Sequence, residues 1–101
     1  MNVIWTKEAL ERLNEIEEYI AQDSPERAEQ FVNYLIERGQ SVPENPHIGR
    51  MVPEILNPDI REIIAKKYRI VFRIQPNSIA ILTVFEGHKL LNPVMQLSQQ
   101  R

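Results

Sequence analysis

Arginine side chains on one predicted β-strand are the residues best suited to chemistry. Apolar side chains take every second position from 68 to 74, so Arg69 and Arg73 point to the opposite face of that strand. Arg61 lies on the preceding strand, and we expect it nearby. A guanidinium offers a planar fork of donors to a phosphate, and it can stabilise charge that develops at a phosphate during cleavage.

A purely structural interpretation of these arginines competes with the chemical one. They can pair with Glu54, Glu62 or Glu86, or cover apolar surface with their aliphatic stems. For Arg73 the structural interpretation is favoured. For Arg69 the residues alone leave the two interpretations balanced.

Other catalytic signatures are absent from the sequence. There is no glycine-rich phosphate loop and no cysteine, and neither His47 nor His88 has a partner at metal-ligand spacing. The carboxylates lie mainly on predicted helix surfaces and form no evident acid–base pair. We therefore expect no cofactor and no metal site.

Three strands are predicted in the second half of the chain. Ile60–Ile64 and Tyr68–Ile74 flank a short basic turn at Ala65–Lys67, and Ile79–Glu86 follows a Gln75–Ser78 turn. The last strand is apolar on both faces, which predicts an interior position in the sheet.

A short β-type run and two helices are predicted before these strands. Residues 2–5 form the run, Thr6 is a suitable N-cap, and a helix follows to about residue 21. Ser24 and Pro25 begin a second helix, Gly39 loosens its end and Pro43 stops it. The apolar stripes of the two helices are Ala9, Leu10, Leu13, Ile16, Tyr19 and Ile20, then Ala28, Phe31, Val32, Leu35 and Ile36.

The predicted fold class is α+β, in the order β-α-α-β-β-β, with a helical hairpin packed on a mostly antiparallel small sheet. Prolines mark residues 43–59 as an irregular, shaped loop, held to the core by Ile48, Met51, Val52, Ile55 and Leu56.

Length and composition favour a single domain over residues 1–101, with a C-terminal segment at 90–101 whose end frays. Without cysteine, a secretory signal pattern or a long apolar run, a cytoplasmic location is expected. Residues 1–50 hold five Lys/Arg against ten Asp/Glu, whereas residues 51–101 hold seven against four. The basic half can meet an anionic partner, although the charge counts alone favour two ordinary solvated faces.

An ordered set of motifs resembles the RelE/ParE superfamily of bacterial type II toxin–antitoxin toxins. The motifs are Trp5-x-x-x-Ala9, Ile16-x-x-Tyr19-Ile20, Ser24-Pro25-x-x-Ala28, Pro46-x-x-Gly49-Arg50, Val52-Pro53-Glu54, Ile60-Arg61-Glu62, Tyr68-Arg69-Ile70-Val71-Phe72 and Glu86-Gly87-His88. The resemblance implies a growth-inhibiting toxin, held inactive by a cognate antitoxin encoded beside it, of the plasmid-stabilisation type.

One branch of this superfamily cuts messenger RNA on the ribosome. Arg69 matches that branch's arginine on the Tyr-Arg strand, and Lys89 stands near its arginine just past the last strand. Arg61 is a further catalytic candidate if the chain cuts RNA. Met95 stands where that branch has a tyrosine, and Met cannot transfer a proton. The chain is also acidic, whereas binding to RNA draws much of its affinity from cations.

The other branch, ParE-like, poisons DNA gyrase by a protein contact, and the sequence is more similar to this branch. The resemblance implies that the antitoxin folds as it binds, in a hetero-oligomer, against Leu90, Leu91, Val94, Met95 and Arg73. Those four apolar residues can instead cap the chain's own core, the alternative that is favoured for Leu90 and Leu91. A third possibility is a non-toxic binding module of the same fold.

Overall fold

The computed structural model of the chain describes residues 1–87. Its elements are β1 (Asn2–Trp5), α1 (Lys7–Ala21), α2 (Pro25–Gln40), the 3-10 turns η1 (Val42–Glu44) and η2 (Pro46–Ile48), β2 (Arg50–Met51), β3 (Ile60–Ala65), β4 (Tyr68–Ile74) and β5 (Ser78–Glu86). The predicted α+β layout is confirmed with one addition. The two-residue strand β2 lies in the segment that the sequence analysis treated as irregular.

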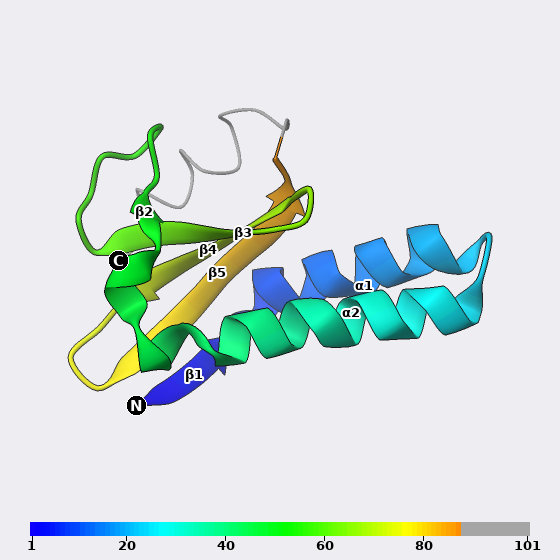
Figure 1. Ribbon diagram of the computed structural model, residues 1–101, viewed down its shortest axis with the longest axis horizontal. Coiled ribbons are helices and arrows are strands. Elements are labelled where there is room, and N and C mark those ends of the chain that lie inside the picture. The colour runs from blue at the N-terminus through cyan, green and yellow to red at the C-terminus, as the bar shows by residue number, and fades with distance from the viewer. Residues whose placement is uncertain (88–101) are drawn as a thin grey trace.

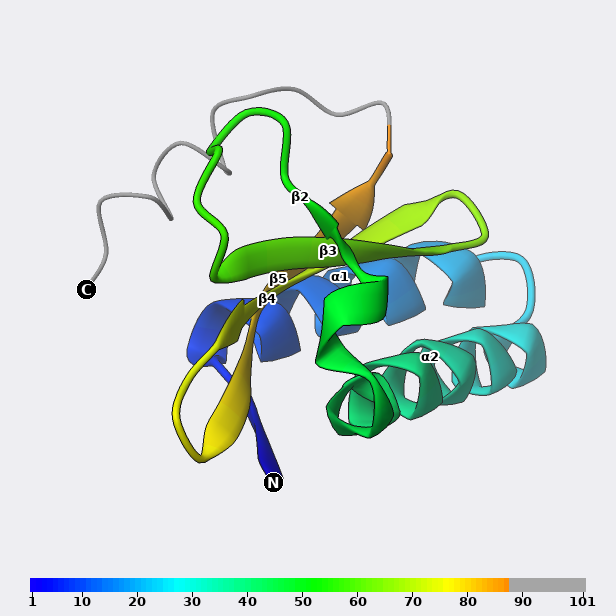
Figure 2. The ribbon, with the colours of Figure 1, turned by 60° about the vertical axis from the view of Figure 1, so that its left-hand side comes forward.

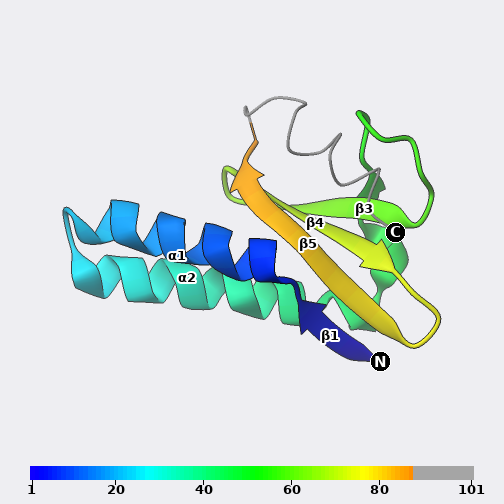
Figure 3. The ribbon, with the colours of Figure 1, turned by 180° about the vertical axis from the view of Figure 1, so that it is seen from behind.

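The five strands form one sheet in the order β1-β5-β4-β3-β2. β1 runs parallel to β5, and the other neighbouring pairs are antiparallel. β5 is interior, as its apolar residues on both faces predicted. Figure 3 shows β1 alongside β5. β1 follows the N-terminus directly and forms one edge of the sheet.

The helical hairpin covers one face of the sheet (Figure 1). Both predicted N-caps are confirmed: the Thr6 hydroxyl accepts from Ala9 N at 3.2 Å, and the Ser24 hydroxyl accepts from Arg27 N at 3.2 Å. The Thr6 hydroxyl also lies 2.8 Å from the carbonyl oxygen of Ile81. This contact fixes the start of α1 against β5.

The larger core lies between the helices and the sheet. Its buried residues are Ala9, Leu13, Ile16, Val32, Leu35, Val42, Ile63, Ala65, Tyr68, Ile70, Phe72, Ile79, Ile81 and Val84. The predicted stripe of α1 was wrong at two positions, because Leu10 is 53% exposed and Tyr19 is 70% exposed.

A β-bulge in β5 keeps this core continuous. Val71 pairs with Thr83 and Phe72 pairs with Ile81, so Leu82 is the extra residue. The insertion reverses the alternation along β5, and both Ile81 and Val84 consequently join the core on the helical side.

The opposite face of the sheet carries a smaller apolar cluster. Val52, Ile60, Val71 and Phe85 are buried there, with Ile55 and Leu82 packed against them. Figure 2 shows the segment between β2 and β3 arching on the side of the sheet away from the helices. Of the residues expected to anchor this loop, Val52 and Ile55 do so. The expectation was wrong for Ile48, Met51 and Leu56, which are 74%, 40% and 71% exposed.

Gly39 has a different role from the one that the sequence suggested. It lies inside α2 and is buried, and a Cβ built there would be 2.6 Å from Cζ2 of Trp5. The residue therefore permits the indole ring to approach the helix backbone, and it does not loosen the helix end. Trp5 Nε1 donates to Gln40 Oε1 at 3.3 Å beside this contact.

Candidate functional site

Arg69 lies at the centre of a network of charges on the sheet face away from the helices. Its Nη1 and Nη2 donate to the two carboxylate oxygens of Glu54, at 2.9 and 2.8 Å, and its Nε donates to Glu62 Oε1 at 2.6 Å. The second oxygen of Glu62 accepts from Arg50 Nε at 2.6 Å. The network joins β4 to β3, to β2 and to the loop between β2 and β3.

This network is largely shielded from water. The side chain of Arg69 is 6% exposed and that of Glu62 is fully buried, while the Arg50 side chain is 60% exposed. The guanidinium carbon of Arg69 lies 4.9 Å from the ring centroid of Phe85, a cation–π distance. Glu62 and Glu54 were among the partners considered for Arg69 from the sequence, whereas Arg50 was missed because it precedes Glu62 by twelve residues in a segment read as loop.

Hydrogen bonding shifts the pKa values within the network. The hydrogen bonds from Arg69 lower the pKa of Glu54 below its ordinary value, more than burial raises it. The carboxylates of Glu54 and Glu62 correspondingly raise the pKa of Arg69. Glu54 and Arg69 are therefore both stabilised in their charged forms. The guanidinium stays positively charged, and the carboxylates beside it balance that charge.

The three candidate arginines lie in different surroundings. Arg61 pairs opposite Phe72, which places it on the helical side of the sheet, whereas Arg69 pairs opposite Ile64 on the other side. Arg61 Nη1 donates to the carbonyl of Gly49 at 3.0 Å and its Nε donates to that of Pro58 at 3.0 Å. Arg61 therefore lies on the preceding strand, as expected, but on the opposite side of the sheet from Arg69.

Arg73 shares the face of Arg69, as the alternation predicted, and it lies opposite Ile60 toward the other end of β4. Its side chain is partly buried and makes interactions of its own. The other candidate residues, Lys89, Leu90, Leu91, Val94 and Met95, lie outside the described residues. Their assignments to catalysis or antitoxin binding stay predictions.

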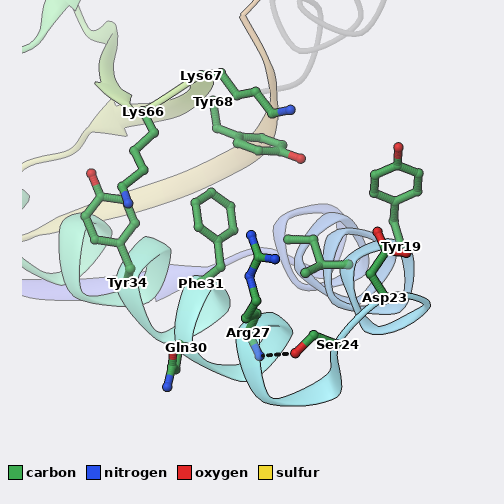
Figure 4. Close-up of a pocket in the computed structure, with 11 residues that line it drawn as sticks. Tyr19, Asp23, Ser24, Arg27, Gln30, Phe31, Tyr34, Lys66, Lys67 and Tyr68 are labelled. Carbon is green, nitrogen blue, oxygen red and sulfur yellow. Dashed lines mark hydrogen bonds between the residues drawn. The ribbon is translucent and has the colours of Figure 1, made fainter.

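A hollow of about 530 Å³ lies between the far end of the helical hairpin and the β3–β4 turn. Figure 4 shows Arg27, Phe31 and Tyr34 rising from α2 toward Lys66, Lys67 and Tyr68 on the sheet side. Tyr19 and Asp23 stand across from them. This hollow was missed from the sequence, because the spacing of Tyr19, Phe31 and Tyr68 is that of ordinary core residues.

A second, smaller groove of about 280 Å³ runs between α1 and the end of β5. Ile16, Tyr68 and Val84 give it an apolar floor, and Arg12 and Glu15 lie at its rim, joined by an ion pair of 2.9 Å.

Within residues 1–87 no cluster of His, Asp or Glu side chains is arranged to hold a metal ion. No helix in the same range is long and apolar enough to cross a membrane.

Comparison with known proteins agrees with the fold and with the motifs. The family model described as "ParE toxin of type II toxin-antitoxin system, parDE" matches residues 3–91. The chain therefore belongs to the ParE toxin family. The expected resemblance to the RelE/ParE superfamily, and to its ParE-like branch, is confirmed.

A solved structure shares the architecture. A chain from the "Chromosomal ParDE TA system from P. aeruginosa" superimposes with a TM-score of 0.72 at 24% sequence identity, over 85% of this chain and 95% of that one. At this identity the likeness is one of fold. The search of curated proteins gave no match.

Proposed function

We propose that this ParE-family toxin inhibits growth by poisoning DNA gyrase through a protein–protein contact, trapping the cleaved-DNA complex. One structural observation supports this reading over RNA cleavage. The guanidinium of Arg69, the principal catalytic candidate, is bound by two carboxylates and is 6% exposed. A phosphate could reach it only if Glu54 left, and removing a partner from a buried ion pair costs about 3 to 5 kcal/mol.

The separation of the arginines supports the same reading. Arg61 and Arg69 lie on opposite sides of the sheet, so they do not converge on one scissile phosphate. Electrostatic catalysis requires donors placed around the position where charge develops. In the described residues, Arg61 and Arg69 do not converge around one such position. A toxin that acts by contacting gyrase with its surface does not need this convergence.

A cognate antitoxin is the second element of the proposal. Its disordered segment folds into the groove between α1 and β5, where Ile16, Tyr68 and Val84 offer apolar contacts and Arg12 and Glu15 offer polar ones. Burying such a floor on association is favourable at roughly 25 cal/mol per Å² before the entropy of ordering is subtracted. Leu90, Leu91, Val94 and Met95 are proposed as further antitoxin contacts, and Arg73, on the opposite face of the sheet, as a separate one.

Pulse-labelling after induction of the toxin alone tests the proposed target in cells. Thymidine incorporation is expected to fall within minutes, before amino-acid incorporation does. An earlier fall in protein synthesis, together with codon-phased cuts in translated messages, would favour the RNA-cutting alternative through Arg69, Lys89 and Arg61. If neither process falls while folded protein accumulates, the chain is a non-toxic binding module.

Hydrogen exchange tests the antitoxin element separately. The partner is the product of a small reading frame next to the toxin gene. On its addition, amides of α1 and of residues 82–86 in β5 should exchange more slowly, whereas those of the β2–β3 loop should be unchanged. Protection confined to the loop would exclude the groove as the binding surface.

A further inference from the structure

The hollow at the far end of the helical hairpin combines aromatic rings with cations. Tyr19, Phe31, Tyr34 and Tyr68 supply the rings, and Arg27, Lys66 and Lys67 supply the positive charge (Figure 4). Asp23 is the one acidic residue in the lining, which leaves the hollow net positive. This contrasts with the helical hairpin as a whole, whose two helices hold eight Glu against four Lys/Arg.

The rings form a connected wall. The Phe31 centroid lies 5.4 Å from that of Tyr68 and 5.9 Å from that of Tyr34, both in tilted arrangements. Tyr19 stands apart from this wall, across the hollow, and is 70% exposed. An aromatic ligand entering the hollow therefore meets ring surface on two sides.

The cations are set around the same space. The Nζ of Lys66 lies 5.1 Å from the ring centroid of Tyr34, and Lys66 sits at the β3–β4 turn with a φ of 57°. Within residues 1–87 no carboxylate forms an ion pair with Arg27 or Lys67. Unlike Arg69, these two residues retain their donors for a ligand.

We propose that this hollow binds a single nucleotide unit, with its base against Tyr19 and the Phe31 wall and its phosphate held by Arg27 and Lys67. Stacking of a base on aromatic side chains beside a cationic groove is a general mode of nucleotide-unit recognition. The volume, about 530 Å³, falls within the ordinary range for small-molecule sites. Asp23 can accept a hydrogen bond from an exocyclic amino group of the base.

A free mononucleotide and one nucleotide of a single-stranded nucleic acid would offer this hollow the same groups. Both carry a flat base and a phosphate at fixed separation. An acidic peptide is the competing class of ligand, and it would use the cations without requiring accessible ring faces. The aromatic content of the wall favours the nucleotide.

Calorimetry on the full-length protein tests this proposal without gyrase or an antitoxin, so its outcome is independent of the proposed target. The probes are adenosine monophosphate, adenosine, inorganic phosphate, a single-stranded RNA hexamer and a glutamate-rich peptide containing one phenylalanine. Adenosine monophosphate should bind at least about tenfold more tightly than adenosine or phosphate alone, because only it uses both parts of the site. If the RNA hexamer binds more tightly than adenosine monophosphate, the ligand of this hollow is a single strand. If the two bind equally tightly, the ligand is a free nucleotide.

Surface variants separate the two parts of the site. The double substitution Arg27→Gln with Lys67→Gln should weaken the monophosphate about tenfold and leave adenosine unchanged, and Tyr19→Ala should weaken both. Lys7→Gln is the matched control, since Lys7 is exposed at the other end of α1 and should have no effect. These side chains are exposed, so circular dichroism should report an intact fold.

The proposal fails if adenosine monophosphate and the hexamer do not bind at millimolar concentration. It also fails if phosphate alone binds as tightly as the monophosphate, or if the acidic peptide competes more strongly than either nucleotide probe.

Discussion

Arg69 and Glu54 meet as a bidentate pair, with both terminal nitrogens of the guanidinium within 2.9 Å of a carboxylate oxygen. The pair fastens the loop between β2 and β3 to the middle of the sheet. It has the geometry of a structural clamp, and it removes from solvent the cation that appeared best suited to catalysis in the sequence.

Glu54→Gln should destabilise the protein at neutral pH. The amide keeps the shape but loses the charge, and charge-assisted hydrogen bonds are worth about 1.5 to 3 kcal/mol. Chemical denaturation followed by circular dichroism measures the change. Glu44→Gln, an exposed change in η1, is the control and should alter the free energy of unfolding very little.

The same pair predicts an acid dependence of stability. The folded-state pKa of Glu54 lies below its ordinary value of 4.5, so its stabilisation is present above that value and is lost as pH falls through the folded-state pKa. The difference in unfolding free energy between the wild type and Glu54→Gln should therefore shrink as pH is lowered from 7 to about 3. A constant difference across that range would show that Glu54 is not stabilised as a carboxylate.

Arg69→Lys distinguishes a structural from a catalytic role for Arg69. Lysine keeps the charge but cannot hold Glu54 and Glu62 through a planar fork, so stability should fall by about 1 to 3 kcal/mol. Growth inhibition should persist at temperatures where the variant remains folded. A folded variant that no longer inhibits growth would place Arg69 in the functional surface.

Gly39→Ala should be destabilising although alanine favours helices. Its Cβ would lie 2.6 Å from the Trp5 ring, and overpacking of this kind costs about 1 to 3 kcal/mol. Asn33→Ala, at an exposed position of the same helix, is the control and should be neutral or slightly stabilising. Thermal denaturation followed by Trp5 fluorescence reports both variants.

Thr83→Val should stabilise the protein. The Thr83 hydroxyl is fully buried, and it has no hydrogen-bond partner among residues 1–87. Replacing an unsatisfied buried hydroxyl with a methyl group of the same shape removes a penalty of about 1 to 3 kcal/mol. A loss of stability would indicate that the hydroxyl has a partner in the folded protein.

Local patterns in the sequence predicted much of this molecule. The alternation in β4, the caps at Thr6 and Ser24, and the apolar faces of β5 each follow from the residues themselves. They required no knowledge of distant contacts, which explains why the α+β layout could be reached from periodicity and capping.

Features that depend on distant contacts could not be reached in this way. The bulge at Leu82 depends on pairing between β4 and β5, and β2 is only two residues long. Gly39 carries an ordinary helix-end signal, while its actual role is set by Trp5 from the other end of the chain. Likewise, Glu54 was one of several possible partners of Arg69, and only the path of the loop selects it.

The most direct test of the proposed function is a cleavage assay with purified gyrase, supercoiled DNA and the purified toxin. The toxin should cause gyrase-linked, cleaved DNA to accumulate, and the cognate antitoxin should prevent this. Folded toxin that leaves gyrase cleavage at its background level, yet cuts messages in a translating extract, would contradict the account and return Arg69 to a catalytic role.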